Sequence, residues 1–202
     1  MYPKIKRIID FVLALGGAII LMPLLLVMGL VIKLDSKGPI FFRQKRIGLH
    51  KGYFNILKFR TMRIDAPKDC PTHLLNNAES CITRVGSFLR KTSLDELPQI
   101  FNIIRGQMSI IGPRPALWNQ YDLIEERDKY GANDIMPGLT GWAQINGRDE
   151  LEIPVKAKLD GEYVQRMDFG FDCKIFFGTI LKVLKRDGVK EGLQLGDAEP
   201  IK

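Results

Sequence analysis

A run of 22 uncharged residues, FVLALGGAIILMPLLLVMGLVI at positions 11–32, constrains the fold of this chain more than any other feature. A helix of this length matches the hydrocarbon core of a bilayer, which is about 30 Å thick. A cleaved signal peptide has a shorter apolar run followed by a small-residue cleavage site, and this run has neither property. A helix in the core of a soluble protein keeps a polar face, whereas this run is apolar on all sides. The run therefore predicts a helix in contact with a membrane.

Two features leave the path of this helix through the membrane open. Basic residues flank the run on both sides, and Lys and Arg near a membrane helix favour the cytoplasmic side. Pro23 lies near the middle of the run, where it removes a backbone hydrogen bond and bends a helix. The residues alone are compatible with a spanning helix and with a re-entrant helix that bends in one leaflet and returns to the same side. The flanking basic residues are Lys4, Lys6, Arg7, Lys33, Lys37, Arg43, Lys45 and Arg46.

The charge of the chain is unevenly distributed. Residues 1–63 contain 12 Lys and Arg against two Asp, whereas residues 64–202 contain 18 Lys and Arg against 21 Asp and Glu. A basic half on an otherwise balanced chain indicates an anionic surface as partner. Nucleic acid is disfavoured because the part beyond the apolar run is net acidic. The basic half therefore favours phospholipid as the partner.

Cysteine usage indicates a reducing compartment, because the chain has three cysteines and no C-x-x-C pair. Cys70, His73 and Cys81 could supply three metal ligands, but a structural zinc site uses four. We therefore expect no zinc site.

The remaining sequence predicts an α+β fold that is mainly α. Residues 38–62 are expected to form a basic β-hairpin, with strands around 40–43 and 53–59. Lys58 and Arg60 on this hairpin are candidates for phosphate contact. We expect three regions: a membrane helix with its flanks at 1–37, a small helical catalytic domain at 38–190, and a tail at 191–202.

Several segments of the catalytic region have recognisable patterns. Short helices are predicted at 82–91 and 93–106, and another in LWNQYDLIEERDKYG. Pro113 and Pro115 exclude regular structure around Arg114 and hold it on an extended turn. Residues 137–148 contain three glycines and are expected to form a structured loop. Residues 171–186 are amphipathic, and such a helix can face a core or lie in the membrane interface.

The adjacent acids Asp95 and Glu96 have two interpretations. Ser93 as N-cap with Glu96 three residues later matches a capping box, which is a purely structural role. Alternatively, a carboxylate surrounded by Arg90, Arg114 and Arg148 suits chemistry on phosphate, as a nucleophile or as a Mg²⁺ ligand. The chain has no Walker A loop, no G-x-G-x-x-G and no G-x-S-x-G. A phosphate-directed carboxylate is therefore the chemistry that the residues permit.

Three motifs resemble those of one known family. KFRTM, SLDELPQIFNIIRGQMSIIGPRP and PGLTGWAQINGR follow the membrane segment in this order. They resemble the bacterial sugar transferases of the monotopic phosphoglycosyl transferase family, and in particular its minimal, catalytic-core members. The resemblance covers about residues 1–190. It implies transfer of a phospho-sugar from a UDP-sugar to polyprenyl phosphate, usually undecaprenyl phosphate, with release of UMP.

The resemblance also implies roles for individual residues. Asp95 would be the nucleophile that forms a covalent phospho-sugar intermediate and would lie near Mg²⁺, with Glu96 as its supporting acid. Arg90 would contact phosphate. The family's Pro-Arg-Pro turn corresponds to Pro113, Arg114 and Pro115. The resemblance also implies that Trp142, Gln144 and Arg148 would bind the nucleotide or phosphate.

The resemblance also bears on the membrane helix and its surroundings. It implies a re-entrant helix broken at Pro23, with both ends on the cytoplasmic face of the bacterial inner membrane. Close relatives carry Ser before this proline, whereas this chain has Met22, so a serine hydroxyl does not support the bend here. A homo-oligomer is compatible with the sequence.

The residues leave other functions open. A lipid-binding scaffold would explain the basic half but not the acidic pair, and a Mg²⁺-dependent phosphohydrolase would use the same acids. The sequence does not identify the sugar; we expect its selection to depend on residues 64–80 and 116–135.

Overall fold

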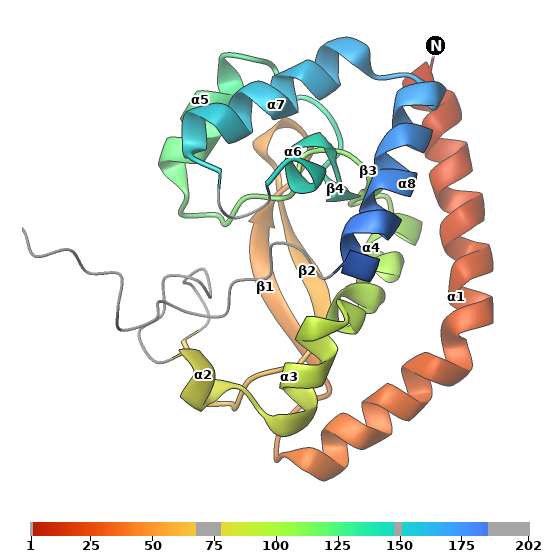
Figure 1. Ribbon diagram of the computed structural model, residues 1–202, viewed down its shortest axis with the longest axis vertical. Coiled ribbons are helices and arrows are strands. Elements are labelled where there is room, and N and C mark those ends of the chain that lie inside the picture. The colour runs from red at the N-terminus through yellow and green to blue at the C-terminus, as the bar shows by residue number, and fades with distance from the viewer. Residues whose placement is uncertain (1, 68–77, 148–150, 186–202) are drawn as a thin grey trace, which may run out of the picture.

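The computed structural model describes residues 2–67, 78–147 and 151–185, and it is mainly helical (Figure 1). Arg148, Cys70, His73 and the tail at 191–202 lie outside the described residues. The elements in chain order are α1 (Tyr2–Asp35), β1 (Phe41–Ile47), the 3-10 helix η1 (Leu49–Lys51), β2 (Tyr53–Phe59), α2 (Ala78–Cys81), α3 (Arg84–Lys91), the 3-10 helix η3 (Leu94–Gln99), α4 (Ile100–Ile104), β3 (Ser109–Ile111), α5 (Tyr121–Asp128), β4 (Gly138–Thr140), α6 (Trp142–Ile145), α7 (Ile153–Arg166) and α8 (Phe169–Lys185).

Helix α1 contains the apolar run and is long and apolar enough, by length and composition, to cross a membrane. Pro23 lies inside it, and Figure 1 shows the helix bent partway along its length. Small and apolar residues along one side are buried against the rest of the protein, whereas the other side exposes large apolar side chains. The buried apolar residues are Ala14, Ala18, Leu25 and Ile32.

Both ends of α1 are attached to the domain. Near its beginning, Lys6 donates to Asp172 of α8 at 2.7 Å, and Asp10 accepts from the Ser109 hydroxyl at 2.6 Å. Near its end, Ile32 packs in a cluster with Phe59 of β2. The helix therefore lies along the domain rather than projecting from it (Figure 1).

Two small sheets form the β part of the fold. Strands β1 and β2 pair antiparallel, with Phe41 opposite Phe59 and Ile47 opposite Tyr53. Strands β3 and β4 pair parallel. The expectation of a loop at 137–148 was therefore wrong, because this segment contains β4 and α6.

Glycine in this segment serves a close approach of two chains. A Cβ atom on Gly138 would lie 2.1 Å from the backbone nitrogen of Gly112, so only glycine fits where β3 meets β4. A strand pairing of this kind has no short-range sequence signal, since its partner lies almost 30 residues earlier (Ser109 pairs with Gly138).

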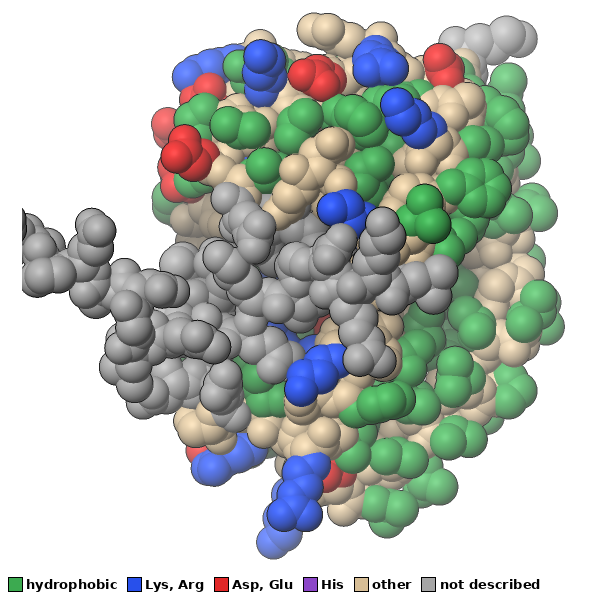
Figure 2. All heavy atoms as spheres, viewed as in Figure 1, with side chains coloured by type: hydrophobic (Ala, Val, Ile, Leu, Met, Phe, Trp, Pro, Cys, Tyr) green, Lys and Arg blue, Asp and Glu red, His purple; other side chains and the backbone are tan. Residues whose placement is uncertain are grey.

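Helices α5, α7 and α8 complete the domain. Helix α5 packs on α7, and α8 packs on α6 and on the β3–β4 sheet. Helix α7 was not predicted, whereas α8 covers the predicted amphipathic segment. Phe176, Phe177, Ile180 and Leu181 of α8 are exposed. Figure 2 shows apolar side chains gathered on the side of the molecule formed by α1 and α8.

Candidate active site

The acidic pair lies on a tight 3-10 helix rather than at the start of an α-helix. Ser93 precedes η3 in the left-handed region at φ +56°, and its side chain makes no capping hydrogen bond. The predicted capping box was therefore wrong, since Ser93 does not cap and the Glu96 side chain is used elsewhere. A left-handed serine costs about 1–3 kcal/mol and occurs mostly where surrounding structure enforces it, often at functional sites.

Glu96 is held by two cations. Its carboxylate accepts from Lys58 Nζ at 2.7 Å and from Arg114 Nη2 at 2.5 Å. These charges and hydrogen bonds hold the pKa of Glu96 well below its usual range despite its burial. Glu96 is thus ionised at neutral pH and holds Lys58 and Arg114 beside Asp95.

The Pro-Arg-Pro turn has no regular structure, as predicted, and backbone contacts on each side fix it. The Pro113 carbonyl accepts from the Gly138 amide at 2.9 Å, and the Pro115 carbonyl accepts from Arg46 at 2.9 Å. Arg114 lies between these two fixed points and is directed to Glu96. These backbone hydrogen bonds hold the chain on both sides of Arg114, and the positioning role of the two prolines stays a prediction.

Asp95 is buried, with 9% of its surface exposed. Burial raises its pKa to about 6, and Glu96 acts in the same direction, whereas Lys58, Arg90 and Arg114 oppose the shift. Near neutral pH the carboxylate is ionised, weakly solvated and surrounded by cations. This environment suits a nucleophile or ligand for a phosphate group.

A cavity of about 930 Å³ connects the acidic pair with other parts of the domain. Asp95, Glu96 and the three cations Lys58, Arg90 and Arg114 line one part of it. Gln144 lines another part; it is 8% exposed, and neither amide atom has a hydrogen-bond partner among the described residues. The cavity thus joins a cationic region to a buried amide that has room for a ligand.

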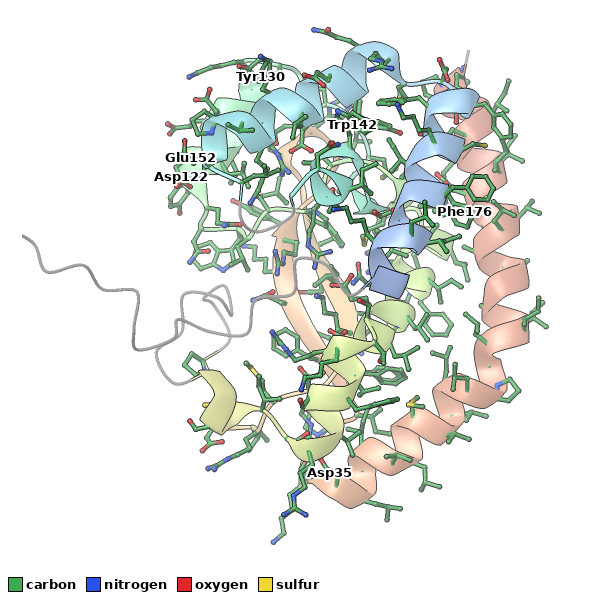
Figure 3. The ribbon with its side chains drawn as sticks, viewed as in Figure 1. Asp35, Asp122, Tyr130, Trp142, Glu152 and Phe176 are labelled. Carbon is green, nitrogen blue, oxygen red and sulfur yellow. The ribbon has the colours of Figure 1, made fainter. Side chains whose placement is uncertain are left out.

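The structure places two of the predicted site residues away from this cavity. Arg60 is buried and donates to the carbonyls of Ser36, Lys37 and Pro39, so it fixes the chain that leaves α1. Trp142 is labelled in Figure 3; its Nε1 donates to Glu162 at 2.9 Å. Its ring packs against Phe171 in a core cluster. The geometry thus gives both side chains structural roles.

Sequence reasoning missed a second cationic group in the cavity wall. Arg127 of α5 donates through Nε and Nη2 to Asp160 of α7, at 2.8 and 2.6 Å. Both side chains are almost completely buried, and burial raises the pKa of Asp160. Arg46 and Lys156 also line the cavity. The sequence signal for this group is the spacing of Lys156 and Asp160, which are four residues apart. It indicates one face of a helix only once a helix at α7 has been predicted.

The residues are compatible with Mg²⁺ but not with a multidentate protein site. Among the residues at 2–67, 78–147 and 151–185, no three His, Cys, Asp or Glu side chains gather as metal ligands. Mg²⁺ is often bound through one or two carboxylates together with substrate phosphates and water. Asp95 can act as such a single ligand, since Glu96 is already neutralised by Lys58 and Arg114.

Comparison with known proteins agrees with the motifs. Residues 1–186 match the family model described as bacterial sugar transferase. The chain is 40% identical over 185 residues to the undecaprenyl-phosphate glucose phosphotransferase of Komagataeibacter xylinus, covering 87% of this chain and 35% of that protein. It is 40% identical over 186 residues to the UDP-glucose:undecaprenyl-phosphate glucose-1-phosphate transferase of Escherichia coli, covering 88% of this chain and 40% of that protein.

A shorter relative matches over most of its length. The uncharacterized sugar transferase EpsL of Bacillus subtilis is 38% identical over 192 residues, which cover 93% of this chain and 91% of that protein. The chain therefore spans less than half of the two glucose transferases and nearly all of EpsL. With a family model that matches residues 1–186, this protein belongs to the bacterial sugar transferase family.

Proposed function

We propose that this protein transfers a phospho-sugar from a UDP-sugar to polyprenyl phosphate and releases UMP, as a first step in the assembly of a polysaccharide or glycoconjugate. The observation that carries the proposal is Asp95, a buried carboxylate with a pKa raised to about 6 that lines a cavity beside Lys58, Arg90 and Arg114. The names of the glucose transferases to which the chain is similar support the same donor and acceptor classes.

The proposed reaction has two displacements at one phosphorus atom. In the first, a carboxylate oxygen of Asp95 attacks the phosphorus that bears the sugar, and the bond to the bridging oxygen breaks with its electron pair leaving on UMP. In the second, a phosphate oxygen of the lipid attacks that phosphorus, and the bond to Asp95 breaks. The carboxylate is regenerated, and the product is a lipid diphosphate sugar.

The surrounding charges support this chemistry. Lys58 and Arg114 line the cavity beside Asp95, where in the proposed reaction they would face the negative charge on the transferred phosphoryl oxygens. Fixed cations of this kind stabilise a transition state without reorganisation. Glu96 keeps both in place. Arg148 lies outside the described residues, and its contact with phosphate or nucleotide remains a prediction. Mg²⁺ would be held by Asp95 and the diphosphate, and would neutralise phosphate charge.

We also propose that α1 is re-entrant and that the protein is monotopic on the cytoplasmic face of the bacterial inner membrane. Residues near both ends of α1 contact the same domain, through Lys6 and Asp172 at one end and Ile32 and Phe59 at the other. A helix crossing the bilayer would separate these two ends by the membrane. The bend at Pro23 and the basic flanks support a helix that enters one leaflet and returns.

A direct assay tests the proposed activity. Purified protein is incubated with UDP-glucose and Mg²⁺, with and without undecaprenyl phosphate, and UMP and the glycolipid are quantified. We expect lipid-dependent turnover and, without lipid, a phospho-sugar mass adduct on Asp95. Lipid-independent release of free sugar phosphate as the main product would instead indicate a phosphohydrolase. Asp95→Asn should lose both turnover and adduct, whereas the control Asp134→Asn, at an exposed position, should retain them.

Cysteine labelling in intact cells tests the topology. Single cysteines replace the exposed Lys4 and Asp35, on either side of the apolar run. We expect a membrane-impermeant maleimide to label neither position until the inner membrane is permeabilised. Labelling of only one of them from outside would show that the helix spans the bilayer.

A further inference from the structure

The buried pair formed by Arg127 and Asp160 is not explained by the transfer chemistry described above. Arg127 is on α5 and Asp160 is on α7, and their side chains are 4% and 1% exposed. Two guanidinium nitrogens of Arg127 donate to one carboxylate oxygen, Asp160 Oδ2. Arg127 also lines the cavity that contains Asp95. Among the described residues Nη1, its third nitrogen, donates no hydrogen bond, so Nη1 can donate to a ligand.

Stability alone is a poor explanation for this pair. Removing two charges from water costs about as much as their attraction returns, so apolar residues of similar size serve a core equally well or better. Asp160 Oδ1 is moreover buried without a hydrogen-bond partner among the described residues. The pair does, however, fix a planar hydrogen-bond donor rigidly in the cavity wall, which a flexible lysine would not do.

The two ends of the cavity differ in the groups that they offer a ligand. Around Asp95 and Glu96 the lining includes Lys58, Arg90 and Arg114, an excess of positive charge that suits a diphosphate. At the α5–α7 end, Arg127 is neutralised by Asp160. The other polar residues of that end are Asn119, Gln120, Asp122 and Lys156. Asp122 and Lys156 carry opposite charges, and together with the amides of Asn119 and Gln120 they give this end both hydrogen-bond donors and acceptors, which suits hydroxyl groups.

The order of the two displacements determines which part of the donor lies at this end. UMP leaves and the lipid phosphate enters on the same face of the phosphorus, opposite Asp95, while the sugar stays attached throughout. In the proposed reaction the lipid would arrive from the side formed by α1 and α8, where apolar side chains gather (Figure 2). A sugar bound on that side would block the exchange. Helix α5, with Asp122, lies across the molecule from Phe176 of α8 (Figure 3).

We infer that Arg127, positioned by Asp160, binds hydroxyl groups of the donor's sugar and contributes to the selection among sugars. This inference rests on the proposed function, because the two-step exchange is what assigns the sugar to the α5–α7 end. It also gives a structural basis for selectivity within 116–135, one of the two segments in which the sequence predicted it.

Kinetic selectivity tests the inference. Transfer is measured with UDP-glucose, UDP-galactose and UDP-N-acetylglucosamine for the wild type, for Arg127→Lys and for the double variant Arg127→Met with Asp160→Leu. The double variant removes both charges together, so it avoids the misfolding expected when Arg127 alone is lost and Asp160 stays buried unpaired. The control Lys51→Gln breaks the exposed ion pair between Lys51 and Asp128, the last residue of α5.

We expect the ratio of kcat/KM between the best and second-best sugar to change by about tenfold or more in both Arg127 variants. Inhibition by UMP should stay unchanged, and Lys51→Gln should behave as the wild type. Ratios equal to those of the wild type would overturn the inference. Weaker UMP inhibition with unchanged ratios would also overturn it, because Arg127 would then contact the nucleoside.

A binding measurement separates this inference from the proposed activity. Isothermal titration calorimetry compares the binding of UDP-glucose with that of UDP. It is done on the Asp95→Asn protein and on the same protein that also carries Arg127→Met and Asp160→Leu. We expect the two added substitutions to remove the affinity that the glucose moiety adds and to leave UDP binding intact. This result does not require turnover. Absence of UMP formation by the wild type would refute the proposed activity alone, whereas an unchanged glucose contribution would refute the role of Arg127.

Discussion

Replacing Asp95 with Asn should abolish transfer and at the same time stabilise the folded protein at neutral pH. Burial raises the pKa of Asp95 from 3.8 to about 6. Between these values the folded state keeps a proton that the unfolded state has lost, so the wild type loses stability as pH rises through this window. About two units of pKa correspond to about 3 kcal/mol at pH 7.5, and Asn, which carries no charge, avoids this cost.

The pH dependence makes this prediction specific. At pH 5 the difference in the free energy of unfolding between Asp95→Asn and the wild type should fall to about half, because Asp95 of the folded wild type is then largely protonated. Thermal unfolding of both proteins in the same detergent, at pH 7.5 and pH 5, measures the effect; for a chain of this size 1 kcal/mol shifts Tm by about 2–4 °C. The 3 kcal/mol is an upper estimate, since the buried amide of Asn also needs hydrogen-bond partners.

The neighbouring Glu96 provides a matched control with the opposite sign. Its pKa is held below the usual range by Arg114 and Lys58, so its ionised form stabilises the fold above the unfolded pKa, and this stability is lost as pH falls. Glu96→Gln should therefore destabilise the protein at pH 7.5. An Asp95→Asn protein that is no more stable than the wild type at pH 7.5, or whose gain is the same at pH 5, would refute the description of Asp95 as a buried, unfavourably ionised group.

Three further predictions follow from the same geometry. First, kcat/KM for the UDP-sugar should rise with pH with an apparent pKa near 6, since the nucleophile must be ionised; a profile flat from pH 5 to 8 would contradict the assignment. Second, Arg60→Gln should lower the free energy of unfolding by about 1–3 kcal/mol because the carbonyls of Ser36, Lys37 and Pro39 lose a charged donor. It should leave KM for the UDP-sugar unchanged, whereas Lys58→Gln should lower kcat; a raised KM in Arg60→Gln would instead indicate that Arg60 contacts phosphate. Third, Gly86→Ala should strongly destabilise the fold, because its Cβ would lie 2.0 Å from the Thr61 carbonyl oxygen; a melting temperature equal to that of the wild type would refute this packing.

Features with a local cause could be predicted from the sequence. The apolar run of α1, the extended Pro113–Arg114–Pro115 turn and the amphipathic α8 each follow from composition or spacing within a short window. The convergence of Lys58 and Arg114 on Glu96 was anticipated only as a collection of charged residues with an affinity for phosphate. The ion pairs themselves join β2, η3 and a turn that are distant in sequence.

Features set by distant contacts could not be predicted. The position of Ser93 three residues before Glu96 predicts an N-cap. Its backbone instead lies in the left-handed region, at the start of η3, which packs against β2. Arg60 has the sequence of a surface cation on a strand, yet it satisfies three carbonyls after α1. The parallel pairing of β3 and β4 depends on the close approach of Gly112 and Gly138. In each case the outcome is decided by a partner from another part of the chain.

The attachment of α1 at both ends has a consequence for how the protein is made. Its inner side supplies core residues, among them Ala14 beside Phe54 and Ile103, so truncating the helix would open the domain rather than release a soluble enzyme. The helix is synthesised before Asp172, which accepts a hydrogen bond from Lys6 and lies 166 residues later in the chain. If α1 enters the membrane as proposed, it does so before the residues that it packs against are made, and the domain would then complete its fold at the bilayer surface.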